Sequence, residues 1–239
     1  MALSIPALSC SPRHVAIIMD GNRRWARERG EDLSEGYRRG VTALRAAVRA
    51  AVTHKLEVLT VYGFSTENWR RETSEISLLM QICAGAAQSE VFGLVREAVR
   101  VRIVGDISPF PPATRAALAQ LVRATARNSK LTLQLALNYS GRAEILAAIQ
   151  SIARDVESGT LLPETIDEDL VRGRLYEPQC PDPDLLIRTG GDLRISNFLL
   201  YQLAYTELFT TDVLWPDFSE EHFSCAVAEY ARRHRRYGE

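Results

Sequence analysis

An acidic residue directly follows a run of apolar, strand-forming residues near the start of the chain. The run occupies residues 14–19, and Asp20 is followed by GNRRW at 21–25. A helix that begins here offers unpaired backbone N–H groups, and two adjacent arginines add donors that suit a diphosphate. The carboxylate would repel this anion unless a divalent metal lay between them, and Mg²⁺ favours such oxygen-rich sites. The alternative is a simple N-cap aspartate followed by solvated arginines.

Two more polar clusters follow strand-like segments. FSTENWRR (64–71) combines hydroxyl, acid and amide groups with two arginines, and RTGGDLRIS (188–196) places two arginines and a serine around a Gly-Gly pair. The second pattern is suited to anion binding. The alternatives are an ordinary capped loop and a common glycine turn. Glu207, in the apolar stretch 204–209, is either a residue at the edge of a helix or a second metal ligand.

Strand-like and helix-like segments alternate along the chain, which predicts an α/β fold with a mainly parallel sheet surrounded by helices. The expected strands are 14–20, 57–64, 99–106, 131–139 and 184–190, and the expected helices are 22–28, 35–54, 73–98, 113–127, 142–159 and 220–235. In such sheets ligands bind beyond the carboxyl ends of the strands, where all three polar clusters fall. The long helix 73–98 either packs in the core or forms the wall of an apolar tunnel.

Composition limits the class of protein. The chain has 239 residues, of which 46% are hydrophobic, and a net charge of −1. We therefore expect one domain at 12–239 with a flexible segment at 1–11, and no nucleic-acid partner, since such binders usually carry excess basic residues. The four cysteines lack metal-ligand spacing and indicate a reducing compartment. No apolar stretch is long enough to span a membrane, and no nucleotide-binding fingerprint occurs.

Four segments together resemble the cis-prenyltransferase family, which includes undecaprenyl and dehydrodolichyl diphosphate synthases. They are HVAIIMDGNRRWAR, VYGFSTENWRR, NYSGR and PDPDLLIRTGGDLRISNFLLYQLAYTELFTTDVLWPDF. The resemblance implies a twisted, mainly parallel sheet around an apolar tunnel, in a homodimeric, Mg²⁺-dependent enzyme. Its activity would be to condense isopentenyl diphosphate, with cis geometry, onto an allylic diphosphate such as the farnesyl, geranyl or dimethylallyl compound.

The same resemblance implies roles for individual residues. Asp20 would be the catalytic acid and a metal ligand, Glu207 a second metal ligand, and Asn68 the group assigned to proton removal. An amide is scarcely basic, so our hypothesis is that Asn68 orients the substrate while a diphosphate oxygen takes the proton. The residues implied in substrate binding are Gly21, Asn22, Arg23, Arg24, Trp25, Tyr37, Ser65, Thr66, Glu67, Trp69, Arg71, Arg188, Arg194, Ile195, Ser196, Arg236 and Gly238.

Three positions depart from the common family pattern and leave the starter open. Arg23 stands where many bacterial members have glycine, Leu33 where arginine is common, and Tyr37 where histidine is frequent. Gly63 is small at a position where a bulky residue can shorten the product. We expect a medium-chain (Z)-polyprenyl diphosphate as product, and the alternatives are a short-chain or irregular product and a non-catalytic partner subunit. The expected location is the cytoplasm or plastid stroma, with peripheral membrane contact for product release.

Overall fold

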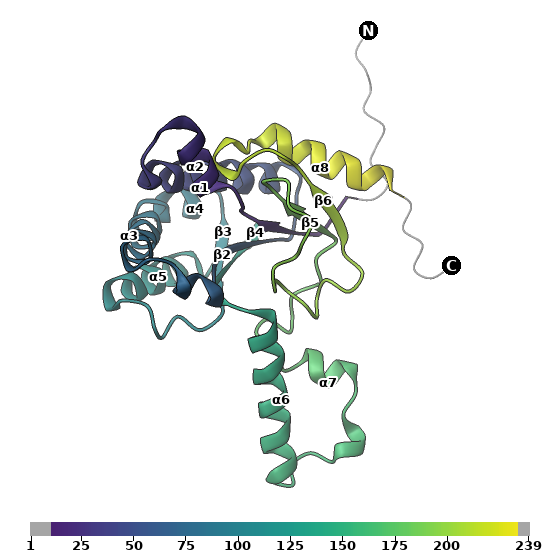
Figure 1. Cartoon of the computed structure of the whole chain (residues 1–239). Helices are drawn as coiled ribbons and strands as arrows, with labels where there is room; N and C mark the ends of the chain where they lie inside the picture. Colours follow the sequence, from purple (N-terminus) through teal and green to yellow (C-terminus); the bar gives the residue numbers. More distant parts are fainter. Residues whose placement is uncertain (1–10, 234–239) are drawn as a thin grey trace.

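The apolar runs of the sequence become six strands of one sheet, which the computed structural model describes within residues 11–233 (Figure 1). The strands are β1 (His14–Ile18), β2 (Val58–Ser65), β3 (Val99–Val104), β4 (Leu131–Tyr139), β5 (Leu185–Arg188) and β6 (Glu207–Thr210). Their order across the sheet is β3-β4-β2-β1-β5-β6, and every neighbouring pair is parallel. The predicted α/β fold with a parallel sheet is confirmed.

Helices connect the first five strands along the chain, as is usual for parallel pairing, and an irregular segment without a helix connects β5 to β6. The helices are α1 (Asn22–Arg29), α2 (Leu33–Thr53), α3 (Thr73–Ser89), α4 (Val91–Arg96), α5 (Pro112–Thr125), α6 (Gly141–Glu157), α7 (Glu168–Arg172) and α8 (Glu220–Arg232). Short 3-10 turns are η1 (Thr66–Arg70), η2 (Pro163–Thr165) and η3 (Trp215–Asp217). None of the described helices is both long enough and apolar enough to cross a bilayer.

Two elements differ from the expectation. The single helix predicted over 73–98 is two helices, α3 and α4, that meet at Glu90. The apolar stripe continues across this junction, so the periodicity gives no sign of the break. The segment with Glu207 forms strand β6 rather than a helix edge. It is a short strand at the edge of the sheet and, among the described strands, pairs with β5 alone, so four residues are all that could indicate a strand in the sequence.

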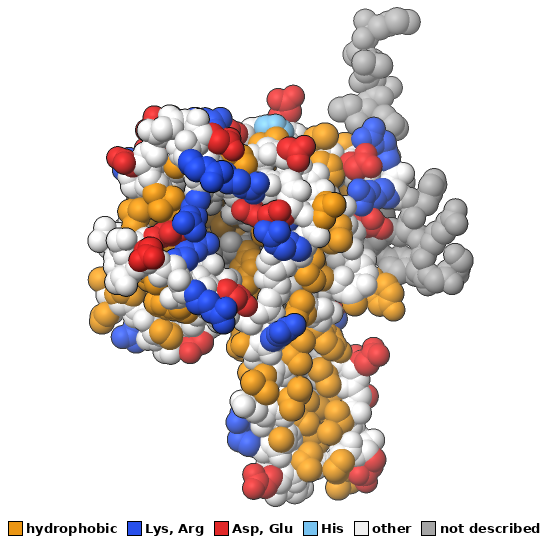
Figure 2. Space-filling model, viewed as in Figure 1, with side chains coloured by type: hydrophobic (Ala, Val, Ile, Leu, Met, Phe, Trp, Pro, Cys, Tyr) orange, Lys and Arg blue, Asp and Glu red, His pale blue; other side chains and the backbone are white. Residues whose placement is uncertain are grey.

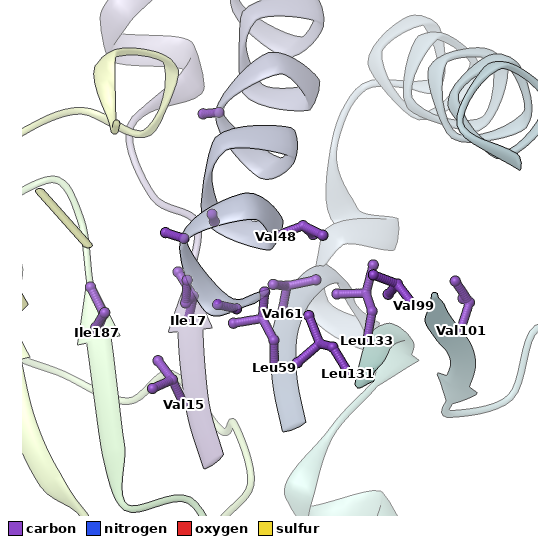
Figure 3. Close-up of a cluster of buried hydrophobic side chains, with 14 of the residues drawn as sticks. Val15, Ile17, Val48, Leu59, Val61, Val99, Val101, Leu131, Leu133 and Ile187 are labelled. Carbon is purple, nitrogen blue, oxygen red and sulfur yellow. The ribbon is translucent and has the colours of Figure 1, made fainter. Parts of the chain in front are cut away.

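The main core lies between one face of the sheet and helices α2, α3, α5 and α8. Side chains two residues apart on each strand, such as Val15 and Ile17 on β1 and Leu59 and Val61 on β2, point into it together (Figure 3). The helices are longer than the strands and bury alanines and other small side chains against this face. A second cluster on the other face packs the sheet against the irregular segment 195–203. Both layers hold the carboxyl ends of the strands in fixed register.

Helices α6 and α7 form an arm that projects from the body of the molecule (Figure 1). The arm carries exposed apolar side chains, among them Leu146 and Ile149 on α6, which are 54% and 55% exposed. Figure 2 shows this surface as a continuous group of hydrophobic side chains. Such an exposed apolar patch indicates a contact site.

Candidate active site

The three polar clusters meet at one edge of the sheet. Strands β2, β1 and β5 are neighbours, and their carboxyl ends carry the segments 65–71, 20–25 and 188–196 respectively. Because parallel strands end at the same edge, segments far apart in the sequence come together there. Figure 2 shows arginine and lysine side chains around a hollow on this part of the surface.

Arg188 is the central cation of this site. Its side chain is only 5% exposed, and Nη2 donates to Asp20 Oδ2 at 2.8 Å and contacts Asp192 Oδ2 at 3.4 Å. The other terminal nitrogen donates to Ser196 Oγ at 2.9 Å and to the backbone carbonyl of Arg194. The remaining nitrogen, Nε, is buried without a partner among the described residues. The planar guanidinium group thus fixes the acid and the Gly-Gly loop relative to each other.

Arg194 extends the cationic surface outward from Arg188. Its side chain is 62% exposed, and Nη2 lies 2.6 Å from Asp192 Oδ2. Desolvation alone would raise the pKa of Asp192, but attraction by the Arg194 and Arg188 guanidinium groups lowers it below its usual value. Asp192 is therefore ionised at neutral pH. Asp20 and Asp192 approach the same Arg188 nitrogen, so two carboxylates lie side by side at the cation centre.

The start of helix α1 lies beside this pair of acids. Gly21 precedes the helix with a φ of 116° and gives it no side-chain cap, so the first backbone N–H groups of the helix receive no acceptor from the N-cap residue. An added Cβ at Gly21 would lie 2.9 Å from Leu214 Cδ2, so both φ and packing require glycine. Arg24 Nη2 lies 3.4 Å from Asp20 Oδ1. The helix dipole and Arg24 together favour an anion here.

Asn68 contributes a hydrogen-bond donor to the site. Its Oδ1 accepts the backbone N–H of Ser65 at 3.1 Å, which closes the first turn of η1. With the oxygen engaged, the side chain presents Nδ2, which can hold a substrate oxygen and cannot take a proton. Glu67, in the same turn, accepts Nδ2 of Asn197 at 2.8 Å and so joins η1 to the 195–199 segment.

A buried carboxylate organises the opposite side of the mouth. Glu75 is 6% exposed, and its Oε1 accepts the hydroxyl of Tyr37 at 2.6 Å and Nη1 of Arg71 at 2.9 Å. Arg71 Nη1 also donates to the Tyr37 hydroxyl oxygen at 2.9 Å, and Arg23 Nε lies 3.8 Å from Glu75 Oε2. Burial, followed by the hydrogen bond to Glu75, raises the pKa of Tyr37. The hydroxyl therefore stays protonated and donates to the carboxylate.

A cavity of about 740 Å³ opens at these polar groups and extends between the sheet and helices α2, α3 and α5. Its mouth carries Asp20, Asn22, Ser65, Glu67, Asn68, Arg71, Arg194, Ser196 and Asn197. Its depth is formed mainly by apolar side chains, among them Val41, Leu44, Leu79, Met80, Ile82, Cys83, Ala86, Ala87, Leu94, Phe110, Leu118, Leu121, Leu133 and Leu135. A charged mouth over an apolar depth suits a molecule with a charged head and a hydrocarbon tail.

Some residues expected at the site do not line this cavity. Trp25 points to Asp217, which accepts its Nε1 at 2.8 Å, and Trp69 packs against Phe64 and donates to Asn138. Thr66 and Ile195 also lie outside the lining, and so do Gly21, Arg23, Arg24 and Arg188, whose contacts at the mouth are given above. The side chains of Trp25, Trp69, Thr66 and Ile195 do not reach into the cavity. Arg236 and Gly238 lie outside the described residues.

The structure does not place Glu207 beside Asp20 within this chain, so their expected role at one metal stays a prediction. Glu207 begins β6 and pairs with Leu185 at the amino end of β5, whereas Asp20 lies beyond the carboxyl end of β1. Its carboxylate is 2.9 Å from Arg233 Nη1. Glu207 is level with Leu185 and Val15 across the sheet, so Asp20 lies five residues farther along, or about 16 Å at the rise of a strand. The motif order in the sequence gives no information on which end of the strand an acid occupies.

Three residues of the site escaped the sequence interpretation. Asp192 lies inside the 188–196 cluster and Asn197 directly follows it. Glu75 is the third residue of α3, a helix that otherwise contributes apolar side chains to the cavity wall. Asn197 has a φ of 63° and bridges Glu67, Ser140 and the backbone N–H of Arg142. The only sequence signal for these residues is their closeness to the motifs.

A family model for prenyltransferases, the undecaprenyl diphosphate synthase family, matches residues 18–238 of this chain. The chain belongs to this family. An isoprenyl transferase of Porphyromonas gingivalis is 49% identical over 227 residues, covering 95% of this chain and 89% of the relative. A ditrans,polycis-undecaprenyl-diphosphate synthase of Salmonella paratyphi A, specific for (2E,6E)-farnesyl diphosphate, is 45% identical over 98% of this chain and 92% of its own length.

The structural comparison agrees with the undecaprenyl diphosphate synthase family. Lavandulyl diphosphate synthase from Lavandula x intermedia, solved in complex with dimethylallyl diphosphate, superposes with a TM-score of 0.93 and 36% identity. The match covers 96% of this chain and 99% of that one. The resemblance read from the motifs is therefore confirmed at the level of family and fold.

Proposed function

We propose that this protein elongates prenyl chains in cis, by condensing isopentenyl diphosphate onto an allylic diphosphate to give a medium-chain (Z)-polyprenyl diphosphate. The observation that carries the proposal is the apolar cavity of about 740 Å³ that opens directly onto the arginine-rich mouth. This volume lies in the upper part of the range of about 300–1,000 Å³ for ligand pockets. It suits a hydrocarbon that grows inward while its diphosphate end stays at the mouth.

The residues at the mouth fit the charge changes of this reaction. The C–O bond of the allylic diphosphate breaks, the resulting cation is attacked by the double bond of isopentenyl diphosphate, and the new C–C bond forms as a proton leaves. The departing diphosphate gains negative charge, which the helix α1 N–H groups, Arg24 and Arg188 stabilise. Nε of Arg188, buried without a partner within residues 11–233, is one donor available to a diphosphate oxygen.

Asn68 holds a substrate in this proposal, because its oxygen is bound by Ser65 and its amide nitrogen is the group that remains for a ligand. The proton then passes to a diphosphate oxygen. We expect Asn68→Asp to lower kcat by about 100-fold, because the amide donor that orients the substrate is lost, while the arginines of the mouth still bind isopentenyl diphosphate. An unchanged kcat would exclude this role.

The donor set at the mouth fits Mg²⁺ with help from the substrate. Mg²⁺ uses one or two carboxylates and completes its shell with waters and phosphate oxygens. Asp20 and Asp192, which share one Arg188 nitrogen, are the residues that would hold the ion. The described residues contain no cluster of three acidic, histidine or cysteine ligands that would hold it without a phosphate. When bound, the ion neutralises charge on the leaving diphosphate.

A second copy of the chain is the partner we propose for the α6–α7 arm. Leu146, Ile149, Leu162 and Ile166 lie on the arm with exposed fractions from 40% to 58%, and Leu208 on the edge strand β6 is 51% exposed. An edge strand and an apolar patch on one chain suit a symmetric contact. We expect a dimer by light scattering and a monomer for Ile149→Asp, with Leu146→Asp as a second test of the same surface.

A short-chain or irregular product is the second candidate. The lavandulyl diphosphate synthase is similar over nearly the whole chain, and Arg23 and Tyr37 alter the mouth that receives the starter. The cavity depth favours elongation over a single condensation. A non-catalytic role is opposed by the intact contact between Asp20 and Arg188, which a partner subunit would have no need to keep.

The test is a product assay with radiolabelled isopentenyl diphosphate and Mg²⁺. Dimethylallyl, geranyl, farnesyl and geranylgeranyl diphosphates are supplied in parallel, and products are resolved by chain length. The proposal expects a metal-dependent ladder of products that Asp20→Ala abolishes. One short product would favour the second candidate, and no incorporation with any starter would overturn the proposal. An assay with vesicles then tests whether an apolar acceptor speeds product release.

A further inference from the structure

One charged side chain lines the apolar cavity far from its polar mouth. Along α3 the cavity wall passes Leu79, Cys83 and Ala86 and then reaches Glu90 at the junction with α4. Glu75 marks the mouth on the same helix, and at the helical rise Glu90 lies roughly 22 Å farther along. The other charged lining residues, such as Asp20 and Arg194, belong to the mouth. Glu90 therefore needs a separate explanation.

Glu90 is joined across the cavity end to helix α2. Its Oε1 accepts Nε of Arg45 at 2.8 Å and Nη2 of Arg45 at 2.5 Å, and the Ser89 hydroxyl at 3.0 Å. Val41 and Leu44, which precede Arg45 on α2, line the cavity. The Arg45 and Glu90 side chains are 44% and 23% exposed. The ion pair thus has the cavity on one side and solvent on the other.

We infer that the Arg45–Glu90 ion pair is a clasp that closes the far end of the cavity and sets the maximum length of the product. The inference rests on the proposed chain elongation. A growing hydrocarbon end that reaches the pair would have to strip water from two charges or separate them, and both changes are unfavourable. Elongation therefore slows at this depth.

The position of the ion pair also explains how a longer hydrocarbon product could extend out of the cavity. A partly exposed ion pair is weak, so the clasp limits length without forming a rigid wall. Phe92 and Val95, on α4 directly after Glu90, are 88% and 43% exposed. A hydrocarbon that extends past the clasp contacts these apolar side chains at the surface. Removal of the pair should lengthen the product for this reason.

The experiment compares product lengths of the full-length protein and its variants at equal total incorporation of isopentenyl diphosphate. Arg45→Ala and Glu90→Ala each break the pair, and Glu90→Gln removes the charge with little change of shape. We expect each variant to move the most abundant product upward by at least one isoprene unit. The exchange variant Arg45→Glu with Glu90→Arg restores a pair of opposite charges and should return the length toward that of the parent.

Arg49→Ala is the matched control. Arg49 lies one turn farther along α2 and forms a more exposed ion pair with Glu220 at 2.7 Å, away from the cavity lining. An unchanged product length in Arg49→Ala, together with longer products in the three clasp variants, supports the inference. Unchanged product lengths in the clasp variants, or an equal shift in Arg49→Ala, would refute the inference. The Arg45–Glu90 pair would then be a surface ion pair that only connects helix α2 to the α3–α4 junction. A parent protein that makes no product would overturn the proposed function itself.

Discussion

Tyr37 offers the sharpest test of how the mouth is built, because the residue departs from the common family pattern and its contacts are defined. Tyr37→Phe removes one hydroxyl that donates to Glu75 at 2.6 Å and accepts from Arg71 at 2.9 Å. The ring and its packing are retained. Glu75 keeps Arg71 and Arg23 as partners, so the carboxylate is weakened and not left alone.

The size of the effect follows from the nature of the lost bonds. A hydrogen bond to a charged group contributes about 1.5–3 kcal/mol, so we expect the free energy of unfolding to fall by about 2 kcal/mol. For a chain of this size the loss corresponds to about 4–8 °C in melting temperature. Arg71 also loses one of its two anchors, and we expect the KM for the allylic starter to rise about fivefold, or about 1 kcal/mol.

Thermal melts and initial rates against farnesyl diphosphate measure both effects on the same preparations. Tyr201→Phe is the control, because its hydroxyl makes only a 3.3 Å contact with a surface backbone carbonyl. That change should stay within about 0.5 kcal/mol. A Tyr37→Phe protein that melts and binds its starter like the parent would refute the idea that the Glu75 cluster positions Arg71.

Three more predictions address the site, the fold and the cavity. Arg188→Lys replaces the buried, planar guanidinium group that contacts Asp20 with a single ammonium group. Steady-state rates should show kcat/KM lowered about 100-fold, which corresponds to about 2.7 kcal/mol. Burial lowers the pKa of His14 from 6.5 to about 4, so the folded state keeps a neutral ring while the unfolded chain takes up a proton. Stability should therefore be complete above pH 6.5 and fall by about 3 kcal/mol toward pH 4, and urea titrations should show a smaller fall in His14→Gln. Gly63→Leu adds four carbons to the cavity wall beside Leu137, and chromatography should show products shorter by about one five-carbon unit.

The sequence motifs were enough to predict the protein family and many of the residues at the mouth of the cavity. Asp20, Arg188 and Ser196 were singled out from local chemistry, and the structure brings them into direct contact. This was possible because each follows a strand, and parallel strands place their carboxyl ends together. The network around Glu75 was not accessible in the same way. Its three partners come from positions 23, 37 and 71, and only packing of α1, α2 and α3 brings them to one carboxylate.

The sequence by itself determined the alternation of strands and helices, the parallel sheet, and the edge at which charged residues gather. These properties depend on patterns within single elements, such as the apolar run of β1 that ends before Asp20. Only the tertiary structure decided that Glu207 lies at the other end of the sheet, that Trp25 turns away from the cavity, and that the helix after Thr73 breaks at Glu90. Those outcomes depend on strand register and on contacts between distant residues, which a local pattern does not contain.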